Sequence, residues 1–128
     1  MIPNFRAWLK KEKEMIDVDE IHWDRGKFEF IGDGITFQRL ANEVEIMQST
    51  GLKDKNGKEI FEGDIVQYQN TKVPSADSKG VIRYFDNWAM FGIDIEHNEP
   101  RALFFNGLAD HISLEVIGNI YENPELLE

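Results

Sequence analysis

A chain of 128 residues is long enough to bury the core of one domain, or of a small domain with a subdomain, without a metal or a disulfide. It has no cysteine, which excludes disulfides, thiolate metal sites and cysteine nucleophiles and fits a reducing compartment such as the cytoplasm. The start of the chain lacks the pattern of a signal peptide, and no apolar run reaches the length of a membrane span, so we expect no membrane association.

The net charge of −10 is concentrated toward the carboxyl end of the chain. Residues 81–128 contain nine acidic and two basic side chains, whereas residues 51–80 contain five of each. Direct nucleic-acid binding is disfavoured, because a phosphate backbone selects clustered Lys and Arg. Lys53, Lys55 and Lys58 make one turn locally basic, and solvation of the turn explains them. An acidic surface can engage a basic partner, although solubility accounts for the same charge.

Residues 5–16 are compatible with two structures. One is a helix with its apolar residues on one side, and the other is two short strands around the charged run at residues 10–14. The alternation of Phe5, Ala7 and Leu9 favours a strand, a turn and a second strand.

The following segments also alternate with the two-residue period of strands. Residues 22–31 predict the end of a strand, a glycine turn and another strand, and Gly-Asp-Gly at residues 32–34 interrupts the pattern. Residues 44–48 alternate again and predict a strand that leads into the next turn.

Residues 47–68, MQSTGLKDKNGKEIFEGDIVQY, join a charged glycine turn to an apolar-alternating strand. Asn56 and Gly57 supply the positive φ values that a tight hairpin needs. Gly63 breaks the regular pattern, and Asp64 then begins a strand, where its carboxylate could accept hydrogen bonds from nearby amides.

The remainder of the chain continues as strands and turns. Residues 69–80 are polar and predict an exposed loop, and residues 81–95 predict a hairpin that turns at Asp86-Asn87. Residues 102–113 are compatible with a strand or a short helix. Residues 114–120 predict a last strand, followed by at most one helical turn.

Many short strands separated by glycine turns predict a mainly β domain whose sheet closes or nearly closes. The pattern is that of successive strands in an SH3-like small barrel. Within a single domain over residues 1–128, we assign residues 47–122 to the barrel. Residues 1–46 would form an additional amino-terminal strand layer packed on it, and residues 123–128 a tail, with little helix overall.

One short stretch offers metal ligands: Glu96, His97 and Glu99. Neighbouring residues on a loop seldom converge on a metal unaided, so a solvated loop is the better explanation. Paired carboxylates could support metal-dependent hydrolysis, but two dozen acidic residues bring some together by accident. The chain has no nucleophile motif and no nucleotide-binding motif. We predict no catalytic residue, no cofactor and no metal.

Four aromatic residues are candidates for an interaction surface: Trp23, Tyr68, Tyr84 and Trp88. Small barrels sometimes use aromatic side chains to hold peptides or cations. Core packing explains most aromatic residues of a small β domain and is the better general explanation. An oligomer contact is a further option for Trp23, because exposed tryptophan favours interfaces.

Three blocks of sequence carry a resemblance to a known family. They are Phe5-Arg6-Ala7-Trp8 with the basic residues and Met15 that follow, MQSTGLKDKNGKEIFEGDIV at residues 47–66, and EVIGNIYENPELL at residues 115–127. In this order they resemble the YopX family of phage and prophage proteins, across nearly the whole chain. The resemblance implies a mainly β fold with an SH3-like barrel, expression from a temperate phage or integrated element, and the bacterial cytoplasm. It also supports the hairpin at the start of the chain.

The resemblance brings no catalytic residue to this chain. We therefore predict a phage or prophage accessory protein that is not an enzyme and acts as a protein-interaction or self-assembling module. Its partner would be a second copy, a host protein or a phage protein. The alternatives are an acidic nucleic-acid mimic that engages a basic host protein, a metal-dependent hydrolase, and a nucleic-acid binder whose lysine turn is joined by Arg83 or Arg101.

Overall fold

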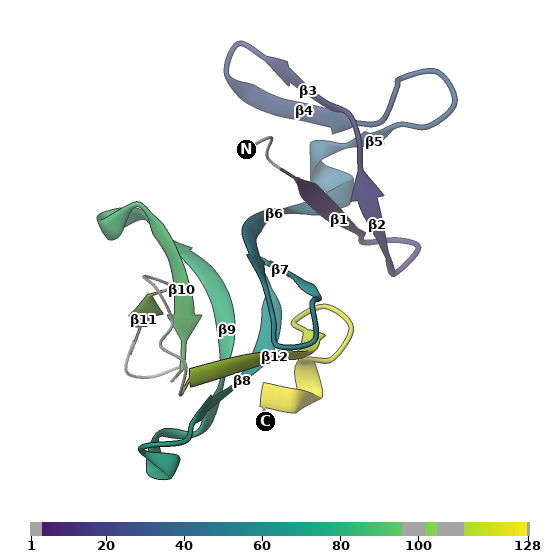
Figure 1. Cartoon of the computed structure of the whole chain (residues 1–128). Helices are drawn as coiled ribbons and strands as arrows, with labels where there is room; N and C mark the ends of the chain where they lie inside the picture. The colour runs from purple at the N-terminus through teal and green to yellow at the C-terminus, as the bar shows by residue number, and fades with distance from the viewer. Residues whose placement is uncertain (1–3, 96–101, 105–111, 128) are drawn as a thin grey trace. The chain divides into compact units, whose positions relative to one another are not determined.

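The computed structural model describes residues 4–95, 102–104 and 112–127 (Figure 1). These residues are mostly β-strand, and among them are four short 3₁₀ turns and no α-helix. The prediction of a mainly β fold with little helix is confirmed. Contacts divide the chain into two compact units, Met1–Ser49 and Thr50–Glu128.

The first unit contains β1 (Phe5–Leu9), β2 (Glu14–Val18), β3 (Ile21–Asp24), β4 (Lys27–Ile31), β5 (Arg39–Leu40), η1 (Ala41–Glu43) and the first part of β6 (Val44–Lys53). β1 and β2 form an antiparallel hairpin in which Ala7 lies opposite Ile16. On its other edge β1 pairs with β6, where Ala7 lies opposite Ile46. Ala7 and Leu9 are both buried, as the two-residue period of a strand requires. The predicted hairpin is therefore confirmed.

β3, β4 and β5 form a separate three-stranded antiparallel sheet. Arg25 and Gly26, with φ of +52° and +80°, make the tight turn between β3 and β4 that the sequence predicted. Ile31 ends β4 and is 1% exposed. It joins the buried core of this unit, which consists of Ala7, Leu9, Ile31 and Val44.

The predicted Asn-Gly turn joins β6 to β7 (Glu59–Phe61), and Gly57 has a φ of +82°. Asp54, which is 8% exposed, organises this turn. One carboxylate oxygen accepts hydrogen bonds from the backbone N–H groups of Asn56 and Lys58, both at 2.9 Å. The other accepts a bond from the N–H of Val116 at 2.9 Å. A single side chain thus ties the turn to the last strand of the chain.

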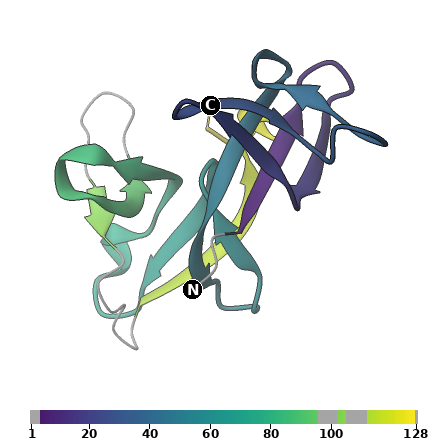
Figure 2. The ribbon, with the colours of Figure 1, turned by 90° about the horizontal axis from the view of Figure 1, so that it is seen from above.

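The second unit contains β7, β8 (Asp64–Asn70), η2 (Pro74–Ala76), β9 (Ser78–Phe85), η3 (Asp86–Trp88), β10 (Met90–Asp94), β11 (Ala102–Phe104), β12 (Ile112–Asn119) and η4 (Pro124–Leu127). Its antiparallel sheet has the order β11-β10-β9-β8-β12, and β12 lies along β8 in both views (Figures 1 and 2). The sheet is curled into a half-barrel, consistent with the predicted small barrel (Figure 1). Its buried core consists of Ile60, Val66, Tyr68, Ile82, Ile93 and Leu114.

A closely packed glycine and a bulge shape the curled sheet. A Cβ on Gly80 would lie 2.3 Å from Cγ2 of Ile93, so no larger residue fits there without movement of β10. A bulge between Val116 and Gly118 shifts the register of β12 against β8.

Asp64 begins β8, as predicted, and its carboxylate accepts a hydrogen bond from the N–H of Phe61 at 2.8 Å.

The loop predicted at residues 69–80 is shorter in the structure. β8 continues to Asn70 and β9 starts at Ser78, which lies opposite Tyr68 in the antiparallel ladder. The polar composition misled the prediction, because ladder hydrogen bonds use the backbone and accept polar side chains on an exposed face. In the next hairpin the predicted turn at Asp86-Asn87 lies in the 3₁₀ turn η3, and the return strand β10 starts at Met90.

The sequence left open whether residues 102–113 form a strand or a short helix. Where the structure describes this segment, it is a strand, in β11 and at the start of β12. Residues 105–111 lie outside the described part of the chain. The last strand is confirmed, and η4 after it is the single helical turn that the sequence predicted.

Candidate functional site

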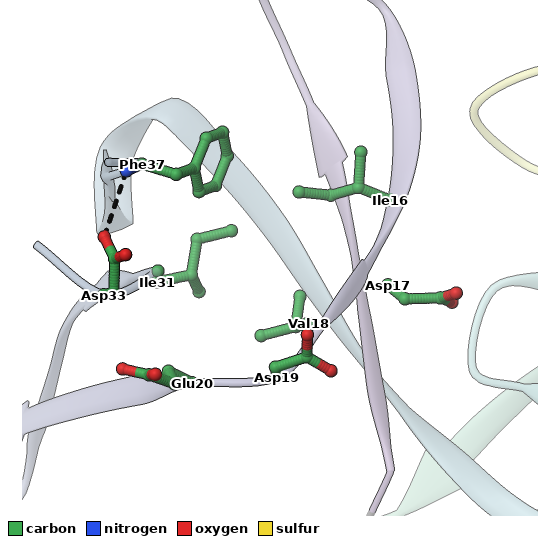
Figure 3. Close-up of a pocket in the computed structure, with 9 residues that line it drawn as sticks. Ile16, Asp17, Val18, Asp19, Glu20, Ile31, Asp33 and Phe37 are labelled. Atoms are coloured by element: carbon green, nitrogen blue, oxygen red, sulfur yellow. Dashed lines mark hydrogen bonds between the residues drawn. The ribbon is translucent and has the colours of Figure 1, made fainter. Parts of the chain in front are cut away.

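A pocket of about 300 Å³ lies in the first unit, between β2 and the turn that follows β4 (Figure 3). It is lined by Ile16, Asp17, Val18, Asp19, Glu20, Ile31, Gly32, Asp33 and Phe37. Four of these nine residues are acidic and none is basic. The pocket therefore combines an apolar interior with a negative charge.

The apolar side chains of Ile16, Val18, Ile31 and Phe37 face one another around the pocket (Figure 3). The first two alternate along β2, so they share one face of the strand. Asp17 lies between them and points to the other side (Figure 3). The apolar floor is thus continuous with the core of the unit, which Ile16, Val18 and Phe37 also contact.

Asp33 builds the wall of the pocket opposite β2. One of its carboxylate oxygens accepts hydrogen bonds from the N–H groups of Ile35 and Thr36, both at 2.8 Å, and of Phe37 at 3.0 Å. The other accepts a bond from the Thr36 hydroxyl. The Thr36 hydroxyl first, and then the backbone N–H groups, hold the pKa of Asp33 well below its usual range. Asp33 is therefore an anion that shapes the turn.

Gly32 makes this turn possible. Its φ is +99°, and a Cβ at this position would lie 2.3 Å from the carbonyl oxygen of Phe37. The Gly-Asp-Gly sequence predicted only an interruption of the strand. In the structure it brings Phe37 back across the end of β4 to close the pocket.

Asp19 and Glu20 form the exposed rim of the pocket, where the chain leaves β2. The Glu20 carboxylate lies 3.7 Å from Nε2 of His22, and Asp19 pairs with no residue in the described ranges. No group of three His, Cys, Asp or Glu side chains in the described residues could hold a metal ion. An apolar floor beside exposed carboxylates is suited to binding a group that is both cationic and partly apolar.

The candidate interaction aromatics have different surroundings within their own units. Trp23 is 60% exposed and packs against Phe28, with ring centroids 5.8 Å apart. Tyr84 is 44% exposed and meets the ring of Phe91 edge-on. Tyr68 is buried in the core of the second unit, as the core-packing explanation expects. The side chain of Trp88 is not among those that the structure describes. Of the other three aromatic residues, none lines the pocket.

The metal candidates Glu96, His97 and Glu99 lie outside the described residues, as does Arg101 of the predicted basic stripe. Two other basic residues of the predicted nucleic-acid surface are paired with acids. Nζ of Lys55 lies 3.4 Å from a carboxylate oxygen of Glu115, and Nε of Arg83 lies 3.1 Å from a carboxylate oxygen of Asp94. These pairs reduce the positive charge that a nucleic-acid backbone would meet.

The sequence did not single out the pocket. Its rim residues follow β2 directly, and its wall is built by Asp33 more than a dozen positions later. Two local patterns were available in the sequence. Ile16 and Val18 alternate just before two acidic residues, and residues 32–34 form a Gly-Asp-Gly turn. Neither signal indicates that the two segments meet.

Fold and pocket together define a small, mainly β protein with a curled antiparallel sheet and an acidic pocket. The chain belongs to the YopX family, because the family model described as YopX protein matches residues 4–128. The predicted family is confirmed.

Two solved structures are similar over nearly their whole length. Protein EF1440 from Enterococcus faecalis is 38% identical, with a TM-score of 0.67, and the match covers 100% of this chain and 99% of that one. YopX from Bacillus subtilis is 20% identical, with a TM-score of 0.66 and 98% coverage of each chain. Comparison with curated proteins gave no match. None of the helical segments in the described ranges combines the length and the apolar character needed to cross a membrane.

Proposed function

We propose that this protein is a noncatalytic interaction module that binds a partner protein through the pocket beside β2. The observation that supports this most is the composition of the pocket. An apolar floor lies next to the exposed carboxylates of Asp19 and Glu20, while Asp33 is fully engaged by its own turn. The pocket lining has no Ser, Thr, Cys, His, Lys or Tyr beside these carboxylates, so the arrangement favours recognition over reaction.

The partner is a host protein, a phage protein or a second copy of the chain, met in the bacterial cytoplasm by an accessory protein of a phage or prophage. The resemblance of the three sequence blocks supports this setting. The charge of the chain supports a basic partner, because acidic surfaces steer basic ones toward them.

The test is affinity capture from a bacterial lysate, with light scattering on the purified protein to detect self-association. The pocket variant replaces Asp19 and Glu20 with Asn and Gln. The control variant replaces Asp24 and Glu29 in the same way, which removes the same charge from residues that do not line the pocket. We expect the wild type and the control to retain the same partner and the pocket variant to lose it. Equal retention by all three proteins would refute a role for the pocket.

A second candidate is the acidic nucleic-acid mimic, which the run of exposed acids at Asp17, Asp19 and Glu20 favours. A mimic binds through many charges, so its affinity falls steeply with salt. Removal of any two exposed acids would then weaken binding by a similar factor. Loss of binding in the pocket variant alone would exclude this candidate.

A further inference from the structure

The pocket is small for a cofactor or a metabolite. Sites for small molecules usually measure about 300–1,000 Å³. At about 300 Å³ this pocket lies at the lower limit, and its rim is open to solvent. Its size is suited to one long side chain of another protein.

The charges of the pocket select a cation. Four acids line it, and the guanidinium of Arg39, in the same unit, is already held. Arg39 donates a hydrogen bond to Glu12 at 2.8 Å and lies over the ring of Phe37, 4.8 Å from its centroid. Because Arg39 is held elsewhere, Asp19 and Glu20 remain to bind an incoming cationic side chain. The aliphatic stem of the incoming side chain would contact the apolar floor of the pocket.

The pocket also lies beside an open strand edge. In its sheet β2 is the terminal strand, with β1 as its single neighbour among the described residues. An extended segment can add to such an edge and place alternate side chains in neighbouring pockets. Pairing of β2 with β2 of a second copy is disfavoured, because it would bring Glu14 and Asp17 of one chain close to the same acids of the other. A basic segment meets no such repulsion.

We propose that the pocket receives the arginine or lysine side chain of an extended basic segment of a partner protein, and that this segment lies along the free edge of β2. This inference rests on the proposed interaction function and names the chemistry of the partner.

The first experiment locates the contact. The probe is the peptide acetyl-Thr-Val-Arg-Val-Thr-amide, and its control carries citrulline, which keeps the shape of arginine without the charge. Both are titrated into the full chain with labelled Ile and Val methyl groups and followed by NMR. We expect the arginine probe to shift the methyl signals of Ile16, Val18 and Ile31, and the citrulline control to shift them far less. Equal shifts with both peptides, or shifts confined to other residues, would overturn the proposal.

The second experiment measures the charge contribution. Two exposed ion pairs together contribute roughly twofold to thirtyfold in affinity. We expect a loss of this size for the Asp19→Asn, Glu20→Gln variant, and less than about twofold for the Asp24→Asn, Glu29→Gln control. Equal losses would mean nonspecific attraction and would overturn the proposal. Unchanged circular dichroism of both variants shows that they are folded.

The third experiment tests the strand edge. Two further peptides carry N-methyl groups on alternate residues, in the two possible registers. Addition to β2 predicts that one register blocks binding and the other does not, because only alternate N–H groups face the edge. Equal binding of both would reject the strand contact. If the lysate partner still requires Asp19 and Glu20 but no arginine peptide binds, the proposed function stands and this inference fails.

Discussion

Replacement of Asp54 by asparagine tests how the β6–β7 turn is attached to β12. The Asp54 carboxylate accepts three backbone hydrogen bonds, two within the turn and one from Val116. An asparagine keeps one oxygen, so its NH₂ group must face at least one of these N–H donors. A hydrogen bond to a charged acceptor contributes about 1.5–3 kcal/mol, and a buried donor without a partner costs about 1–3 kcal/mol. We expect Asp54→Asn to lower the free energy of unfolding by about 2 kcal/mol, which corresponds to roughly 8 °C in Tm.

The measurement is urea unfolding followed by tryptophan fluorescence, with hydrogen exchange at the amide of Val116. The matched control is Glu115→Gln, which affects two longer surface contacts to the same turn, from Lys55 and Asn56 at 3.4 Å each. We expect the control to lose less than about 1 kcal/mol. If Asp54→Asn loses no more than the control, and exchange at Val116 is unchanged, Asp54 does not hold the turn on β12.

The effect of this substitution depends on pH. Burial favours the neutral carboxyl and acts to raise the pKa of Asp54, but the N–H groups of Val116, Lys58 and Asn56 outweigh it and the net pKa is lowered. A lowered pKa in the folded state stabilises the protein above the pKa of the unfolded state, and this contribution is lost as the pH falls through the folded value. The stability difference between wild type and Asp54→Asn is therefore largest near neutral pH. We expect it to shrink below about pH 4.

Three further substitutions test other parts of the structure. Asp33→Ala removes the acceptor that organises the pocket wall, so we expect amide exchange at residues 35–37 to accelerate at least about tenfold, and unchanged exchange would contradict the assigned role of Asp33. Gly80→Ala places a Cβ against Ile93 and should destabilise the second unit by about 1–3 kcal/mol in thermal unfolding, whereas a neutral result would mean that β10 adjusts freely. Trp23→Ser removes a 60% exposed side chain, so we expect a stability change below about 0.5 kcal/mol, and a larger loss would show that Trp23 supports the fold.

Local patterns in the sequence predicted the local structure well. The alternation of Phe5, Ala7 and Leu9 indicated a strand, and the Asn56-Gly57 pair indicated a tight turn, because both depend on the backbone preferences of neighbouring residues. Boundaries were less predictable. The polar residues up to Ser78 looked like a loop, yet they continue the ladder, since backbone pairing does not require apolar side chains.

The sequence alone determined the strand content, the principal turns and, through three separated blocks, the family. The tertiary structure decided which distant residues meet. Asp54 reaches Val116 across 62 positions of the chain, and the Asp33 turn folds back to β2 to form the pocket. A strand pattern specifies which face of a strand is apolar but not which other segment covers that face. The acidic pocket exists only because strand pairing and a glycine turn bring two individually ordinary segments together.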